Sequence, residues 1–223
     1  MKKLTLTLTA IIFSISLFAQ DNAYFPKEGT TLVSKATVKS PMGEQEMYTV
    51  QTAKYDDNKI VLNAKIYSKL GDEQPIQSLS YTYNVSNDNI SIALQDMLKE
   101  QIEQMGDLEI IKASDDYVLP KELEIGKEYP EASLELKGKV QGMDMELTMA
   151  IKNRKAECKE TIEVPAGKFE CIKYSESIIV NAMGQEIATD ITTWYSEGVG
   201  PVKQVVESMG GMVTNTSELI EIK

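Results

Sequence analysis

The sequence predicts an all-β protein: a curved antiparallel sheet, arranged as a sandwich or half-barrel of meanders and hairpins, with one amphipathic helix packed across it. Three observations predict this fold class. Apolar and polar residues alternate with a period of two through most of the chain. Short segments rich in glycine, proline, asparagine and aspartate separate the alternating runs. One segment changes to the three- and four-residue spacing of a helix.

Residues 1–19 have the pattern of a signal peptide. Lys2 and Lys3 precede an apolar stretch, and Leu17-Phe18-Ala19 fits a cleavage site. The stretch is shorter and more polar than a membrane-spanning helix requires, and no cysteine near the cleavage point offers a site for a lipid anchor. We therefore expect residues 20–223 to form one exported β-rich domain, periplasmic or extracellular, that does not span a membrane.

The charge and composition exclude several function classes. The chain has 34 acidic and 23 basic residues, and removal of Lys2 and Lys3 leaves 34 − 21, a net charge of −13. Nucleic acids and anionic lipid surfaces require basic patches, so neither is an expected partner. The chain has no histidine, which excludes Ser-His-Asp and Cys-His nucleophile systems and most catalytic zinc sites. We expect no cofactor.

The first half of the chain predicts an antiparallel meander. Turn-forming residues at Ser40–Gly43 and Asp56–Asn58 separate alternating runs that fit strands. The predicted strands are Thr31–Val38, Glu46–Tyr55, Lys59–Leu70 and Ile76–Ser86.

A helix follows this meander. Its apolar residues recur at three- and four-residue steps, and Gly106 ends the pattern. We expect the stripe to face the core rather than a partner: Leu94, Met97, Leu98, Ile102 and Met105.

Strands resume in the second half and alternate with tight turns. Two strands are predicted at Ala132–Val140 and Met143–Cys158. The turns that follow are predicted at Pro165-Ala166-Gly167, Met183-Gly184, Gly198–Pro201 and Gly210-Gly211.

Methionine stands beside glycine at four of the predicted turns. Glycine supplies the positive φ that a hairpin turn requires, but this does not explain the methionine. One interpretation is that the tips form an exposed apolar patch of an interaction module. Another is a copper(I) site, because thioethers bind soft metals; its ligands would be Met143, Met145, Met209 and Met212. Methionine also fills gaps in cores, and we expect no metal.

Several motifs occur in an order that resembles a known family. They are "LPKELEIGKEY", the "NR" at Asn153-Arg154, "VPAGKFECIKYS", "TTWYSEGVGPVKQVVES" and the terminal "SELIEI". Together they are similar to the TapB-like family of uncharacterised exported proteins with a domain of unknown function, of the type common in the Bacteroides group. The resemblance covers most of the chain after the signal peptide and departs from the family's pattern at Pro201.

The resemblance implies a fold and no activity. It implies a curved antiparallel β-structure with a helix packed across it, and it carries over no catalytic residue. The matching positions have architectural roles by this resemblance: Gly126, Arg154, Pro165, Gly167, Phe169, Trp194, Tyr195, Gly198 and Gly200. Arg154 is the single arginine of the chain. Such a residue can orient a carboxylate substrate, but we expect a pair with a glutamate on a neighbouring strand.

The two cysteines, Cys158 and Cys171, are predicted to remain unbridged. If Val164 faces Phe169 across the Pro-Ala-Gly turn, Cys158 faces Ser175. Cys171 then lies four residues away, or roughly 13 Å along the strand. A disulfide requires Cα atoms within about 7 Å of each other.

These observations favour a non-enzymatic exported protein that carries an apolar ligand or acts in envelope assembly. A curved sheet with a helix over its mouth can enclose an apolar cavity, which makes an apolar small molecule or an envelope protein the expected partner. The lining would be Val61, Ala64, Ile66, Leu79, Tyr81, Met97 and Leu98.

Three alternatives remain open. The same residues can pack directly on the helix and leave no cavity. A hydrolase such as a glycosidase would place two carboxylates about 5 to 10 Å apart in a cleft. A structural or interaction module would bind no ligand.

Overall fold

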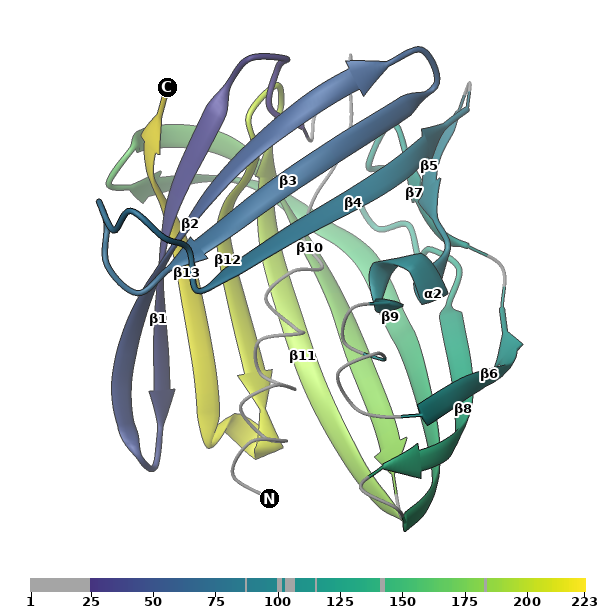
Figure 1. Cartoon of the computed structure of the whole chain (residues 1–223). Coiled ribbons are helices and arrows are strands. Elements are labelled where there is room, and N and C mark those ends of the chain that lie inside the picture. Colours follow the sequence, from purple (N-terminus) through teal and green to yellow (C-terminus); the bar gives the residue numbers. More distant parts are fainter. Residues whose placement is uncertain are drawn as a thin grey trace.

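A computed structural model describes residues 25–86, 88–99, 102, 107–114, 116–140, 143–182 and 184–223, with the backbone alone described at Met143. Within these residues thirteen strands form one antiparallel sheet (Figure 1). The predicted all-β class is confirmed, as one curved, unclosed sheet with a short α-helix. Residues 1–24, which include the expected signal peptide, lie outside the described part.

Most strands follow the predicted alternating runs. The strands are β1 (Thr31–Ser40), β2 (Gly43–Asp56), β3 (Lys59–Tyr67), β4 (Gln77–Val85), β5 (Asn89–Ile92), β6 (Asp107–Ala113), β7 (Tyr117–Pro120), β8 (Ala132–Val140), β9 (Met143–Val164), β10 (Gly167–Ala182), β11 (Gln185–Ser196), β12 (Gly200–Ser208) and β13 (Val213–Ile222). Of these, β5, β6 and β7 were not predicted. The described helices are α2 (Leu94–Met97) and the 3-10 turn η1 (Met209–Gly211).

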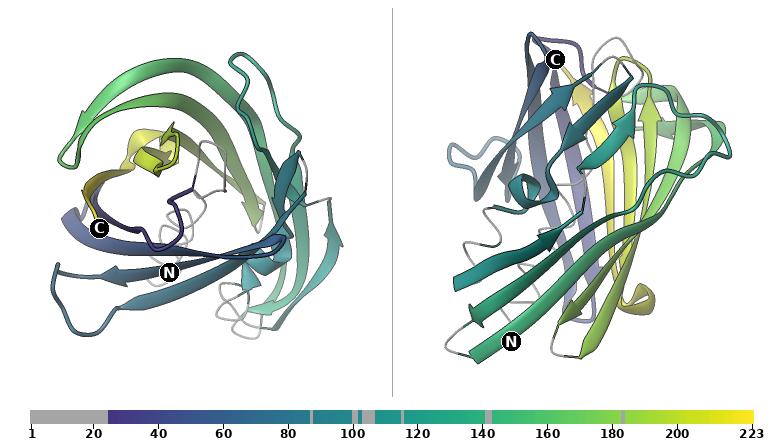
Figure 2. Two further views of the ribbon diagram at one scale, coloured as in Figure 1. Left: turned by 90° about the horizontal axis from the view of Figure 1, so that it is seen from above. Right: turned by 90° about the vertical axis from the view of Figure 1, so that its right-hand side faces the viewer.

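The strand order explains the curvature of the sheet. Its order is β6-β8-β9-β10-β11-β12-β13-β1-β2-β3-β4-β5-β7, so the first and last strands of the chain pair in the middle. β6 and β7 are consecutive in the chain but occupy opposite edges. Four peptide steps from Ala113 to Tyr117 span at most about 14 Å. The sheet therefore curls until its two edges approach each other, as the view from above shows (Figure 2).

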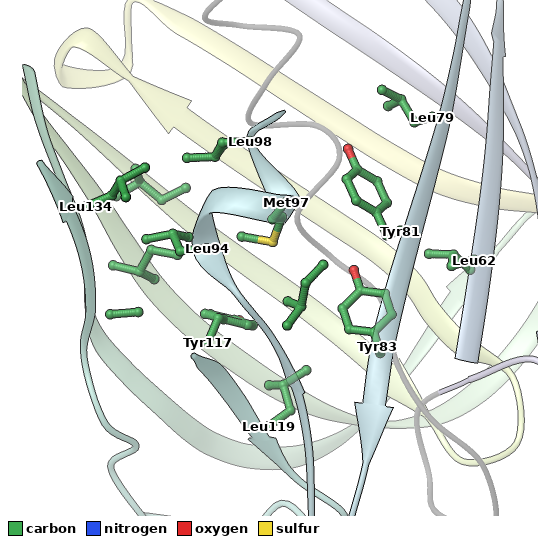
Figure 3. Close-up of a cluster of buried hydrophobic side chains, with 14 of the residues drawn as sticks. Leu62, Leu79, Tyr81, Tyr83, Leu94, Met97, Leu98, Tyr117, Leu119 and Leu134 are labelled. Atoms are coloured by element: carbon green, nitrogen blue, oxygen red, sulfur yellow. The ribbon is translucent and has the colours of Figure 1, made fainter. Parts of the chain in front are cut away.

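The helix lies on the concave side of this sheet. Leu94, Met97, Leu98 and Ile102 are all buried in the main core, which agrees with the predicted core-facing stripe. In Figure 3 the α2 side chains lie between the tyrosines of β4 and Leu134 of β8. The expected end of the helix at Met105 and Gly106 lies outside the described residues.

The register of the β9–β10 hairpin differs from the prediction. Val164 pairs with Gly167 rather than facing Phe169, and Cys158 pairs with Lys173 rather than Ser175. The prediction was wrong because the loop contains only Pro165 and Ala166, and Gly167 already belongs to β10. The shorter loop moves the cross-strand partners by two positions from the turn to Lys173, where the register shifts again.

Across the described ranges, we find no helix with the length and apolar content needed to cross a membrane.

Candidate functional site

A buried ionic cluster lies where β9 changes the direction of its side chains. Ile151 is buried, and strict alternation would next bury Asn153. Instead Asn153 adopts a positive φ of 54°, and the β9–β10 register shifts between Ser175 and Ser177. Such an irregularity re-aims the following side chain, and Arg154 enters the core with 1% of its surface exposed.

Arg154 joins separate parts of the chain through its guanidinium group. Its Nε donates to the Tyr174 hydroxyl at 3.0 Å. Its Nη1 and Nη2 donate to the backbone carbonyls of Pro130 at 2.6 Å and Val118 at 2.7 Å. The guanidinium carbon also lies 4.0 Å from the centroid of the Tyr117 ring, a favourable cation–π distance. Arg154 therefore connects edge strand β7 to β9, near the opposite edge of the sheet.

Glu176 completes the cluster from β10. Its Oε2 lies 3.7 Å from Arg154 Nε and accepts a hydrogen bond from the Tyr117 hydroxyl at 2.8 Å. Burial raises the pKa of Glu176, although Arg154 and Tyr117 oppose this shift. Burial by itself would lower the pKa of Arg154, but Tyr117, Tyr174 and Glu176 raise it above its ordinary value. The guanidinium therefore stays charged inside the protein.

The position of Arg154 rules out the substrate-orienting role considered from the sequence. The side chain is buried, and acceptors of the chain itself occupy Nε, Nη1 and Nη2. A substrate carboxylate would have to displace these partners. The cluster is consequently a connection between the two ends of the sheet rather than a binding site.

An open polar cleft lies apart from this cluster. Its volume is about 1300 Å³, and it is bordered by the β9–β10 hairpin, the β11–β12 turn and the segment after β7. Acids and lysines are mixed along it: Asp88, Glu122, Glu124, Glu160, Glu170, Glu197, Lys121, Lys127, Lys159 and Lys168. Mixed signs do not select a ligand of one charge.

The cleft offers little support for carboxylate catalysis. Glu124 is paired with Lys127, and Glu160 accepts a hydrogen bond from Trp194 Nε1 at 2.6 Å. A general acid requires a raised pKa. Burial raises the pKa of Glu176, but this residue lies in the core and does not border the cleft.

The predicted cavity lining is found on one apolar surface, with one exception. The buried core on the concave face includes Ala64, Ile66, Leu79, Tyr81, Met97 and Leu98. Val61 was wrongly placed, because it is half-buried on the other face of β3. Strand side chains alternate between faces, so Ile60 and Leu62 are the inward neighbours.

The same surface extends to strands that the sequence interpretation did not include. Leu134 and Leu136 of β8 and Leu147 and Met149 of β9 belong to the same buried cluster as the helix. Their alternation along each strand was a usable signal. What the sequence did not contain was the strand order that brings β8 and β9 opposite β4.

The two proposed pairs of metal ligands are not brought together. Met145 is buried on β9, whereas Met209 and Met212 are exposed at the β12–β13 turn. Two strands lie between β9 and β12 in the sheet order. The side chain of Met143 lies outside the described part. The structure therefore gives no support to a copper site formed by these residues.

The Met-Gly turns share one end of the molecule. The hairpins β1–β2, β8–β9, β10–β11 and β12–β13 all turn at the same end, because their strands alternate in direction along one antiparallel sheet. Met42, Met209 and Met212 are exposed there. This placement is compatible with the interaction-surface hypothesis, which remains a prediction.

The remaining positions that the resemblance marks as architectural lie at turns or in smaller clusters. Phe169 and Trp194 pack on a cluster containing Leu32, Val202 and Leu219, and Tyr195 packs in another with Tyr174. Pro165 occupies the β9–β10 turn. Positive φ angles are found at Gly126, Gly167, Gly198 and Gly200.

Both cysteines are free, with Cys158 exposed and Cys171 buried. In the observed register Cys171 pairs with Glu160, so the two cysteines are offset by two residues and not four. Diagonal neighbours of this kind lie about 7–8 Å apart, which is still beyond the span of a disulfide.

Comparison with protein families agrees with this architecture. A family model described as DUF3108-like matches residues 27–219. The chain belongs to the DUF3108-like family. This family indicates no catalytic activity, and the narrower TapB-like assignment stays a prediction. The comparison with curated proteins found no match.

Two solved structures share the fold of this DUF3108-like chain. One is described as an exported protein with a YmcC-like fold from Bacteroides fragilis; it has a TM-score of 0.61 and 19% identity, over 91% of this chain and 99% of that chain. The other is described as a lipoprotein from Parabacteroides distasonis; it has a TM-score of 0.61 and 20% identity, over 92% of this chain and 100% of that chain. At these identities the likeness concerns the fold alone.

Proposed function

We propose that this DUF3108-like protein is a non-enzymatic periplasmic protein that binds an apolar ligand on the concave face of its sheet. The observation that carries the proposal is the continuity of the apolar surface. It runs from β3 and β4 across α2 to β8 and β9, on a sheet that does not close. Ligand sites are typically concave and mostly apolar.

The extent of the surface supports the proposal. The buried cluster includes side chains of strands from both halves of the sheet. These side chains are at most 8% exposed, so a ligand on this face has to replace groups of the chain that cover it. Apolar contacts with the ligand would then take the place of contacts within the chain.

Native mass spectrometry on protein purified gently from its host envelope tests the proposal. We expect an adduct of lipid mass that organic solvent removes. The variant Ala64→Met fills the concave face without adding charge and should reduce the adduct. Asn63→Met changes the neighbouring exposed position and should leave it intact.

A bare protein mass from wild type, under conditions that retain a known non-covalent complex, would contradict the proposal. Equal adduct in both variants would place the ligand elsewhere on the molecule.

A further inference from the structure

The concave face has a second wall of different chemistry. On β2, β11, β12 and β13 the buried inward positions include uncharged polar side chains: Thr49, Thr189, Thr193, Gln204 and Asn215. Register places them on the core side of the sheet. Thr49 pairs with Ile66 across β2–β3, and Asn215 pairs with Val206 across β12–β13. Ile66 and Val206 both belong to the main core.

A small cavity opens into this polar wall. Its volume is about 20 Å³. It is bordered by side chains of four neighbouring strands, β12, β13, β1 and β2, which include Gln204, Ser217, Ser34, Thr49 and Gln51. A space of this size holds one water-sized group. Lys203 also borders the cavity, but its ammonium group is paired with Glu218 at 2.6 Å.

Thr49 is the residue that indicates a ligand. Its side chain is 4% exposed, and its hydroxyl has no hydrogen-bond partner among the described residues. By contrast, Gln204 Nε2 donates to Thr193 Oγ1 at 3.0 Å. A buried polar group without a partner is costly to the folded state, so a hydroxyl placed here is best explained by a partner that arrives from outside the chain. Asn215 Oδ1, further along the same wall, is also buried and has no hydrogen-bond partner in the described part of the chain.

We propose that the cavity around Thr49 binds the uncharged polar group of an amphiphilic ligand, such as a free hydroxyl of a glycerolipid, while the acyl chain lies on the apolar wall. This inference rests on the proposed function and names the ligand class. The wall favours an uncharged head, because a buried charge would find no opposite charge among the threonine, serine and glutamine side chains at the cavity. A threonine hydroxyl can both donate and accept, and so can a glycerol hydroxyl.

Two probes allow binding to the apolar wall and binding to the polar wall to be measured separately. The first is the apolar dye N-phenyl-1-naphthylamine, whose binding to the protein without its signal peptide is followed by fluorescence. The second is monolauroylglycerol, measured by displacement of that dye. We expect Thr49→Val to weaken binding of monolauroylglycerol about fivefold to tenfold, the effect of one lost buried hydrogen bond, and to change dye binding less than about twofold on the same scale.

Two further variants serve as controls. Thr49→Ser keeps the hydroxyl and should retain wild-type affinity for monolauroylglycerol. Thr52→Val makes the same chemical change on the exposed face of β2 and should alter neither probe. Thermal unfolding of each variant checks that the fold is intact.

The outcomes distinguish this inference from the proposed function. If both probes bind and Thr49→Val affects neither, or both equally, the polar site is overturned and the apolar binding surface stands. If neither probe binds wild type, both proposals are overturned.

Discussion

Arg154 shows what one residue does in this fold. Its three hydrogen-bonded nitrogens donate to Tyr174 of β10, to the carbonyl of Pro130 and to the carbonyl of Val118 in edge strand β7. The fork geometry of arginine suits several acceptors at fixed directions, and lysine cannot reproduce it. A charge this deep is stable only because each donor has a partner and Glu176 lies beside it.

We predict that Arg154→Met destabilises the protein by about 3–5 kcal/mol, because it leaves Glu176 as an uncompensated buried charge. Urea unfolding measures this change. The double variant Arg154→Met with Glu176→Gln should recover part of the loss, since the buried carboxylate is then also removed. A single variant as stable as wild type would show that the cluster contributes nothing to the fold.

The two thiols should react very differently. Burial raises the pKa of Cys171 to about 11, and the thiolate is the reactive form, so Cys171 should resist alkylation at pH 8 until the protein unfolds. Cys158 is exposed and should be labelled in the folded protein. Intact mass after iodoacetamide treatment gives the count, and peptide mapping gives the site. A mass two daltons below the reduced value would show a disulfide between the two cysteines. Equal labelling of both thiols in the folded protein would disprove the predicted difference in reactivity.

At the scale of elements, β6 pairs with β8 along its length and approaches it very closely at Gly138. An added Cβ at Gly138 of β8 would lie 2.0 Å from the carbonyl oxygen of Asp107, the first residue of β6. Backbone atoms cannot yield as a flexible side chain does. β6 pairs only with β8, so it has no second neighbour to hold it in place.

We therefore predict that Gly138→Ala releases β6 while the rest of the sheet persists. Amide hydrogen exchange over residues 107–113 should become fast, with protection of β10–β13 unchanged. Lys137→Ala is the matched control on the same strand, since it removes an exposed ion pair with Glu146 that contributes little. Unchanged protection of β6 in the glycine variant would show that the strand can shift to accept the methyl group.

For the whole molecule, the absence of histidine makes the pH dependence simple. No side chain of this chain has an ordinary pKa between 5 and 8. Burial raises the pKa of Glu176 above its ordinary value of 4.5. A carboxyl group of this kind is easier to ionise in the unfolded chain, so it reduces stability progressively as the pH rises from 4.5 through the raised pKa.

The measurement is the free energy of unfolding of wild type and Glu176→Gln across this range. The wild-type value minus the variant value should decrease as the pH rises and become constant above the raised pKa. Exposed carboxylates cancel in this difference because both proteins contain them. A difference that is constant with pH, or that increases, would show that Arg154 and Tyr117 outweigh burial.

The sequence by itself determined the local structure, because strand alternation and hairpin turns depend on neighbouring residues. The long strands, most turns and the apolar stripe that begins at Leu94 were predictable in this way, but the short strands β5, β6 and β7 were not. Side chains such as Ala64, Ile66, Leu79 and Tyr81 were correctly expected on one face. Val61 was not, since a shift of one residue exchanges the two faces of a strand, and the cysteine register failed through a turn shorter than expected.

Only the tertiary structure decided how distant strands meet. Pairing of β1 with β13 joins residues far apart in the chain, and no local pattern encodes it. The roles of Arg154 and Thr49 also depend on how distant segments are brought together. Arg154 acquires its role from acceptors on three segments. In the sequence Thr49 cannot be told from any other strand threonine. The curvature of the sheet buries it in the polar wall, and we propose that its hydroxyl there binds the polar group of the ligand.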